Sequence, residues 1–203
     1  MPKPLPVSFF RRPADVVAPD LIGCSLVVRQ RRSSGAGALR LRATITEVEA
    51  YLGTADPASH VWKGRRTPTV RNLYAPPGTW YVYRSYGLHW CCNLTAKGPN
   101  EGHAVLLRGV LTTDARTLEV AQRRRGAVAQ RDLTNGPGKL TQALGIDISL
   151  DGVPMAGSRA TVHIGSVVSR GKGSPTPDLG PVLVTPRIGI TRAVDWPLRW
   201  VVK

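Results

Sequence analysis

The sequence has 203 residues, a length typical of one domain with a substantial buried core, and carries a formal net charge of +15. All but six of its 28 basic residues are arginines, whose planar guanidinium groups pair with phosphates and stack on bases. This charge favours a nucleic-acid partner over an acidic membrane surface, because no basic amphipathic helix with a bulky apolar face is present in the sequence.

The residues that could bind metal or form disulfides are few and poorly spaced. Cys24, Cys91 and Cys92 form neither a CxxC pair nor a disulfide framework, and the four histidines lack the spacing of a metal site. No segment has the apolar stretch of a signal peptide or a membrane span. We therefore expect a reduced, cytoplasmic protein that uses no metal and binds no membrane.

Glycine and proline punctuate the chain without a linker between two halves. We therefore expect a single domain over residues 1–203, with a loose segment at 1–8. Periodicity, caps and turns predict an α+β fold, in which peripheral helices surround a mostly antiparallel sheet. The predicted helices span 14–24, 113–125 and 134–144, and the predicted strands span 25–30, 38–45, 79–85, 89–96, 104–110, 160–167 and 182–184.

Carboxylates follow an apolar strand pattern in the segment TEVEAYLG. The preceding alternation, ALRLRATI, places its leucines on one face, and the same register continues that face with Glu47, Glu49 and Tyr51. Either a β-bulge turns the acids to solvent or to a structural arginine, or one of them is a buried general base. Arg108 likewise interrupts an apolar strand and needs an anion, for which Glu49 is available. Such a pair would be structural, or would keep Glu49 ionised.

Aromatic residues supply a second signal. The segment YVYRSYG ends in a tight turn at Tyr86 and Gly87, where Tyr86 either folds back over its hairpin or inserts between base steps. Tyr51, His60 and Tyr83 either pack internally or sandwich a base.

Basic residues in two segments are candidates for phosphate contacts. The loop HVWKGRRTPTVRN contains Lys63, Arg65 and Arg66. The segment GPGKL predicts a helix start, where backbone amides and Lys139 could meet a phosphate.

Taken together, these segments resemble the alkyladenine (3-methyladenine) DNA glycosylase family, in its mammalian-type branch that also occurs in bacteria. The resemblance runs from about Phe9 to near the C-terminus. It implies a single compact domain with a curved sheet and a protruding β-hairpin that enters the minor groove of damaged duplex DNA. It also implies that no metal or organic cofactor is used, and we expect a monomer. The motifs that carry the resemblance are TEVEAYLG, ASH, GRRTPTVRN, PPGTWYVYRSYGLHWCCN, AVLLRG, NGPGKLTQALGI and PRIGI.

The resemblance also implies a role for each matching residue. Glu49 would activate a water for attack on C1′ of the flipped nucleotide, and Arg108 and the carbonyl of Ile188 would hold that water. Asn93 would crowd the 2-amino group of a normal guanine, and Tyr86 would fill the gap left by flipping. The walls of the base pocket would be Tyr51, His60 and Tyr83.

The expected activity is monofunctional hydrolysis of the N-glycosidic bond of alkylated or deaminated purines in base excision repair. Flipping costs a few kcal/mol, least for a damaged pair. A cationic purine is a good leaving group and gains about 0.5–2 kcal/mol over a tyrosine face. The choice among 3-methyladenine, 7-methylguanine, hypoxanthine and ethenoadenine stays open.

Two other classes of function also stay open. A basic binding module without chemistry would bind nucleic acid with steep salt dependence and no lesion preference. A nuclease would need clustered carboxylates for metal, whereas Asp114, Asp132 and Asp147 are scattered. A glycosylase–lyase would need an amine such as that of Pro2, and would leave an adduct that borohydride traps.

Overall fold

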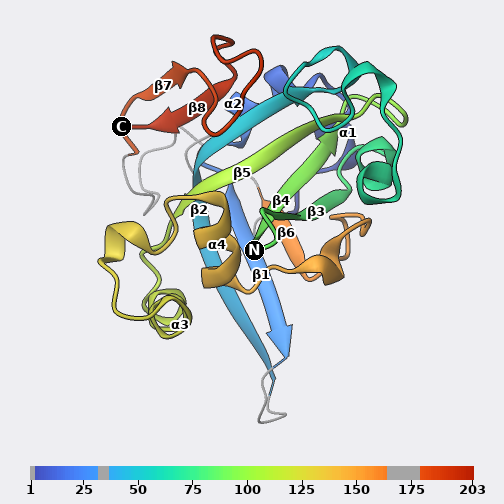
Figure 1. Ribbon diagram of the computed structural model, residues 1–203. Helices are drawn as coiled ribbons and strands as arrows, with labels where there is room; N and C mark the ends of the chain where they lie inside the picture. The colour runs from blue at the N-terminus through green and yellow to red at the C-terminus, as the bar shows by residue number, and fades with distance from the viewer. Residues whose placement is uncertain (1–2, 32–36, 164–178) are drawn as a thin grey trace.

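A computed structural model describes residues 3–31, 37–163 and 179–203. In these residues an eight-stranded sheet has the order β3-β4-β5-β2-β1-β6, with β8 on β2 and β7 on β8 (Figure 1). Every described pairing is antiparallel, which confirms the predicted α+β class. The strands are β1 (Ser25–Arg31), β2 (Ala38–Leu52), β3 (Trp80–Ser85), β4 (His89–Ala96), β5 (His103–Leu111), β6 (Ala160–His163), β7 (Val182–Thr185) and β8 (Arg199–Val202).

Helices and short 3-10 turns surround this sheet. Helix α2 packs on β2, β4 and β5, whereas α4 packs on β4, β5 and α3. The α-helices are α1 (Val7–Phe10), α2 (Ala14–Leu21), α3 (Ala115–Arg125) and α4 (Pro137–Leu144). The 3-10 turns are η1 (Gly53–Ala55), η2 (Trp62–Gly64), η3 (Pro68–Tyr74), η4 (Gln130–Asp132) and η5 (Ile148–Leu150).

Strand β2 is longer than predicted and organises the sheet. Its first half pairs with β1, and the two strands extend from the body as a ribbon in Figure 1. Its second half pairs with β5 on one edge and with β8 on the other. The sequence did not predict β8, which lies in the Arg- and Trp-rich tail.

A β-bulge near Thr46 reverses the faces of β2. Ile45 pairs with Val110 and Glu47 with Gly109, so that Thr46 is an extra residue on this strand. Beyond the bulge, Val48 takes over the core-facing side. The prediction that the acids continue the leucine face was therefore wrong: the bulge turns them to the opposite side of the sheet.

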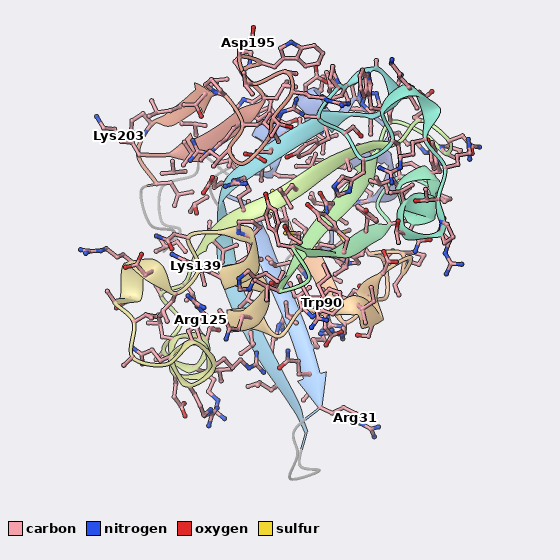
Figure 2. The ribbon with its side chains drawn as sticks, viewed as in Figure 1. Arg31, Trp90, Arg125, Lys139, Asp195 and Lys203 are labelled. Carbon is pink, nitrogen blue, oxygen red and sulfur yellow. The ribbon has the colours of Figure 1, made fainter. Side chains whose placement is uncertain are left out.

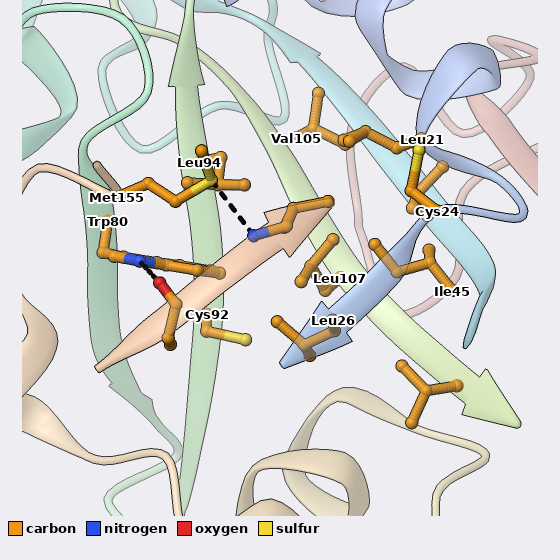
Figure 3. Packing of buried hydrophobic residues seen from close by; sticks show 14 of the residues in the cluster. Leu21, Cys24, Leu26, Ile45, Trp80, Cys92, Leu94, Val105, Leu107 and Met155 are labelled. Atoms are coloured by element: carbon orange, nitrogen blue, oxygen red, sulfur yellow. Dashed lines mark hydrogen bonds between the residues drawn. The ribbon is translucent and has the colours of Figure 1, made fainter. Parts of the chain in front are cut away.

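The main core lies on the sheet face that β2 presents through its leucine side. Figure 3 shows Leu107 and Ile45 in this core with Trp80, whose indole N–H donates to the carbonyl of Ala160 at 3.0 Å. These three side chains have no exposed surface. Because alternate residues of a strand face opposite sides, the burial of Leu107 leaves its neighbour Arg108 on the other face.

The N-terminal segment is attached to the sheet rather than loose. The described part begins at Lys3, Pro4 forms a bridge with His163, and the Leu5 N–H donates to the carbonyl of Val162 at 2.8 Å. Leu5 is buried in the main core. Apolar burial and this backbone bond therefore correct the prediction for residues 3–8.

The predicted start of one helix changes for a physical reason, and the predicted end of one strand is not tested. Helix α4 begins at Pro137 rather than at residue 134, because the Thr134 hydroxyl donates to the carbonyl of Val110 and Asn135 bridges to Gly109. Strand β6 is described as far as His163, and the remaining predicted positions, 164–167, lie outside the described residues.

Helix α3 begins with an aspartate N-cap. The Asp114 carboxylate accepts from the Thr117 N–H at 2.8 Å, as expected of an N-cap aspartate.

A buried ion pair attaches the chain after β7 to the turn after β2. Arg187 donates from Nη2 to Asp56 Oδ1 at 2.9 Å and from Nη1 to the carbonyl of Ala50 at 3.0 Å. Both side chains of the pair are fully buried. Burial alone would raise the pKa of Asp56, but hydrogen bonds from Arg187 and the backbone outweigh it, and the pKa is lowered.

Replacement of Leu107 by alanine should destabilise the protein by about 2–5 kcal/mol, since it removes buried methyl groups and leaves a cavity. Chemical denaturation of Leu107→Ala measures the change. Leu88→Ala is the matched control, because Leu88 is 72% exposed and its loss should change the unfolding free energy by about 0.5 kcal/mol or less. Equal unfolding midpoints for the two variants would contradict the assigned core.

Replacement of Asp56 by alanine should cost about 3–5 kcal/mol at neutral pH, because it leaves the Arg187 guanidinium buried without its anion. The control is Asp20→Ala, which breaks the exposed pair between Arg12 and Asp20 and should cost about 1 kcal/mol or less. Because the pKa of Asp56 is lowered on folding, its contribution is complete above the ordinary aspartate range and is lost as the pH falls through the lowered value. The difference between wild type and Asp56→Ala in denaturant should therefore shrink in acid.

Candidate active site

A pocket of about 1040 Å³ opens on the sheet face opposite the main core. Strands β3, β4 and β5 provide its floor, and side chains from the turns after β2 and from the segment after β7 provide its walls. Residues that line it include Tyr51, His60, Arg65, Tyr81, Tyr83, Cys91, Asn93, Leu106, Arg108 and Ile188.

Glu49 lies immediately beneath this lining and has no exposed surface. Its Oε1 accepts from the Ile188 N–H at 2.8 Å, and its Oε2 accepts from the Tyr51 hydroxyl at 2.9 Å. Arg108 Nη1 lies 3.3 Å from Oε1. Burial raises the pKa of Glu49, and Arg108, Ile188 and Tyr51 only partly offset this effect. A carboxylate with a raised pKa and a cationic neighbour has the properties of a general base that works near neutral pH.

A second carboxylate completes a charged cluster next to Glu49. Glu47 Oε1 accepts from Arg108 Nε at 2.7 Å and from Arg199 Nε at 2.7 Å. The three side chains are only 12–16% exposed. Nearby carboxylates raise the pKa of the Arg108 guanidinium although burial alone would lower it, so Arg108 is cationic.

Aromatic rings form one wall of the pocket. Tyr81 and Tyr83 stack with their ring centroids 5.3 Å apart, and the His60 ring meets the Tyr83 ring edge to face at 4.6 Å. His60 Nδ1 lies 3.0 Å from the Tyr81 hydroxyl. Burial lowers the pKa of His60 and raises the pKa of both tyrosines, so these three rings are neutral near pH 7.

The Tyr51 ring lines the same pocket and is held in place by contacts with Arg187 and Glu49. The Arg187 guanidinium lies 4.6 Å from its centroid, and the Tyr51 hydroxyl donates to Glu49. Burial is the main cause that raises the pKa of Tyr51, and the Glu49 charge adds to it. Tyr51 therefore stays protonated and remains a donor to Glu49.

Asn93 and Cys91 lie on the pocket floor in β4. Asn93 is 4% exposed, and its Nδ2 donates to the carbonyl of Tyr81 at 3.1 Å. This bond fixes the orientation of the amide on the pocket floor. Burial raises the pKa of the Cys91 thiol, so this thiol is protonated and is no nucleophile.

The turn between β3 and β4 carries its apolar residues outward. Tyr86 is 88% exposed with φ of +50°, and Leu88 is 72% exposed. Gly87 between them also has positive φ, as tight hairpin turns require. Tyr86 therefore does not fold back over its hairpin and is free to contact a partner.

The four basic residues considered for phosphate contact come from two segments, and only Arg65 lines the pocket. Lys63 lies 4.6 Å from the Trp62 ring, and Arg66 lies 4.0 Å from the Tyr74 ring. These residues come from the teal segment of Figure 1.

Lys139 belongs to the other segment and lies on α4 (Figure 2). It donates to Asn135 at 2.8 Å and lies 3.7 Å from Asp132, so its charge is already partly neutralised.

The structure thus brings Glu49, Arg108 and the predicted base-pocket residues into one site. For Ile188 it shows an N–H bond to Glu49, which the sequence did not predict. Sequence reasoning also missed Arg187 and Arg199, since a lone arginine in a polar tail carries no signal of its partner. Tyr81 could have been found from its position two residues before Tyr83 on the same strand face.

Among the described residues, no three His, Cys, Asp or Glu side chains gather as metal ligands would. No helix in the described ranges is long and apolar enough to cross a membrane.

Comparison with known proteins agrees with the resemblance found in the motifs. The family model described as "Methylpurine-DNA glycosylase (MPG)" matches residues 8–203. A Rhodopseudomonas palustris (strain BisB5) protein named "Putative 3-methyladenine DNA glycosylase" is 42% identical over 192 residues, which cover 95% of this chain and 83% of that protein. Proteins of the same name from Methanoculleus marisnigri and Burkholderia lata are 40% and 38% identical, over 98% and 97% of this chain and 95% and 86% of theirs.

The match extends over nearly the whole chain and includes the segments that build the pocket. The chain therefore belongs to the methylpurine-DNA glycosylase family, and it is a DNA glycosylase, a hydrolase that acts on N-glycosyl bonds of alkylated purines in damaged DNA.

Proposed function

We propose that the protein flips an alkylated or deaminated purine out of duplex DNA into this pocket and hydrolyses its glycosidic bond with a water activated by Glu49. The observation that carries the proposal is the buried Glu49 carboxylate, which three donors hold directly beneath an aromatic pocket. A surface that only binds phosphates has no need of a buried acid.

The reaction exchanges one bond for another at C1′. As the C1′–N bond breaks, its electron pair leaves with the purine, and the sugar gains oxocarbenium character that the Glu49 carboxylate stabilises. The water oxygen bonds to C1′ and its proton passes to Glu49. A purine cationic from N3 or N7 alkylation leaves as a neutral base and needs no strong general acid.

Access of the water to Glu49 requires an opening in the lining. Glu49 is not itself exposed, but its two neighbours Arg108 and Ile188 both line the pocket. A carboxylate accepts about four hydrogen bonds, so Glu49 can accept one from a water in addition to those it makes. We place the water between Arg108 and Ile188, where the Ile188 carbonyl would be its other partner.

The walls suit a flat and cationic base. A cation over a tyrosine face gains roughly 0.5–2 kcal/mol, and Tyr51 and Tyr83 offer two such faces. His60 is neutral and does not repel the positive charge. Deaminated purines are neutral and would bind through stacking on the same rings. Asn93 would exclude guanine through its 2-amino group.

Base flipping requires a filler for the gap that it leaves in the duplex. Tyr86 at the tip of the β3–β4 hairpin is the most exposed of the large hydrophobic side chains described. Insertion of such a side chain between base steps partly offsets the cost of unstacking.

The site also favours hydrolysis without strand cleavage. None of the described residues that line the pocket is a lysine, so no lining amine is placed to form a Schiff base. We propose that the protein acts as a monomer on chromosomal DNA in the cytoplasm.

Replacement of Glu49 by glutamine should lower the single-turnover rate of base release by about 100-fold or more, since a general base contributes about 10²–10⁴. The measurement is abasic-site formation in one duplex with 7-methylguanine and another with hypoxanthine. Glu101→Gln is the control, because Glu101 is an exposed glutamate paired with Lys97. If Glu49→Gln releases the base at the wild-type rate, on a duplex from which wild type releases it, Glu49 is not the general base.

Replacement of Tyr86 by alanine should lower base release from duplex DNA by about 5- to 100-fold, because a stacked aromatic side chain contributes about 1–3 kcal/mol per base. The loss should be smaller when the lesion lies in a mismatch, which is easier to open. Val184→Ala removes another exposed apolar side chain, 55% exposed and outside the pocket lining, and should leave the rate unchanged. An equal loss on matched and mismatched duplexes would argue against intercalation.

A further inference from the structure

Glu47 is a nearly buried carboxylate that the mechanism above does not use. One oxygen of it, Oε1, accepts hydrogen bonds at 2.7 Å from the Nε atoms of both Arg108 and Arg199. Its side chain is 13% exposed. Two charge-assisted bonds from two different strands, β5 and β8, define its position closely.

The bond to Glu47 restricts how Arg108 can meet Glu49. The planar guanidinium has a fixed fork of donors, and Glu47 occupies Nε while Nη1 lies 3.3 Å from Glu49 Oε1. Without Glu47, both ends of the fork could turn to Glu49 as a bidentate pair. Such a pair would occupy the acceptor sites that a water needs.

The backbone of β5 is shaped to admit Glu47. A Cβ at Gly109 would lie 3.0 Å from Glu47 Cβ and 3.3 Å from its Oε2. Gly109 is also the partner of Glu47 at the bulge. The glycine therefore lets the carboxylate lie against the strand that carries Arg108.

Arg199 connects this cluster to the C-terminal strand. It is the register partner of Glu49 in the β2–β8 pairing, and its Nη1 donates to Thr185 Oγ1 of β7 at 2.9 Å. Arg199 is thus held at both ends, by Glu47 and by Thr185. The positive charge of Arg199 helps to neutralise Glu47, which would otherwise have only Arg108 as its cationic partner.

We propose that Glu47 and Arg199 are positioning residues, which aim the Arg108 guanidinium at Glu49 so that a water can lie beside it. This inference rests on the proposed role of Glu49 as the general base. It extends the functional site to β8, a strand at the far end of the sequence.

The charges around Glu49 predict how each change would act on its ionisation. Loss of the negative Glu47 removes repulsion and favours the Glu49 anion, whereas loss of the positive Arg199 leaves Glu47 less neutralised and disfavours it. The titratable and charged groups near Glu49 are Glu47 and Tyr51 on β2, Cys91 on β4, Arg108 on β5, Arg199 on β8 and Arg187 behind Tyr51, together with the Ile188 N–H.

The test is the pH profile of single-turnover release of 7-methylguanine from duplex DNA by Glu47→Gln and Arg199→Met. The acid limb should move down by about half a pH unit or more in Glu47→Gln and up by a similar amount in Arg199→Met. The plateau rate should fall by roughly 10- to 100-fold in both, because Arg108 is no longer aimed.

Thr185→Val is the matched control, since it removes the other partner of Arg199 and keeps every charge. Its acid limb should stay in place. If Glu47 and Arg199 only stabilise the fold, all three variants should lose stability and none should shift the acid limb of the pH profile. The proposal is overturned if the acid limb is unchanged in Glu47→Gln and Arg199→Met, or if it moves in the same direction in both.

A second readout separates this inference from the role of Glu49. The ¹³C resonance of the Glu49 carboxyl group, titrated in DNA-free protein, should show the same opposite shifts and does not depend on the lesion. Opposite shifts together with a wild-type rate for Glu49→Gln would refute the role of Glu49 as general base but would support the effect of Glu47 and Arg199 on Glu49. A Glu49→Gln protein that is inactive, with no opposite shifts in the other variants, would refute the positioning role alone.

Discussion

The extra residue in β2 at Thr46 controls which side of the sheet each later side chain faces. Before it, the strand buries Leu41 and Ile45 in the main core, and after it Val48 continues that face. Glu49 is thereby turned to the pocket side. Without the bulge the period of two would bury the acid among aliphatic side chains, where an unpaired carboxylate is very unfavourable. The one extra residue in β2 thus lets Val48 face the core while Glu49 faces the pocket.

A carboxylate on the pocket side still has to be held without water around it. Glu49 obtains a backbone N–H, a tyrosine hydroxyl and a guanidinium, and these come from the segment after β7, from β2 and from β5. Glu47 and Arg199 then fix the guanidinium. The Ile188 N–H is positioned in turn by the ion pair between its neighbour Arg187 and Asp56, so the site extends to these two residues. The geometry around Glu49 and the stability of the C-terminal region therefore depend on the same bonds.

Local patterns predicted much of this protein. Strands β3, β4 and β5 follow from local alternation, and β4 has the predicted bounds. Glu49, Arg108 and the aromatic residues were identifiable because each breaks an apolar pattern or repeats on one face. The β8 strand was not identifiable, since its partner on β2 is about 150 residues away and no local signal specifies that pairing. The attachment of the N-terminal segment, through Leu5, depends on an equally distant contact.

By itself the sequence determined the family, through several long motifs in order, and the residue types that the chemistry needs. It also determined that Arg108 faces the same side as Leu106, since alternation over two positions is a local property, and both residues line the pocket. Only the tertiary structure decided the side that Glu49 faces, and it also assigned the Ile188 N–H and Arg199 to the cluster. These outcomes depend on strand register and on charge pairing between distant segments, which are fixed only when those segments have paired with β2 in the sheet.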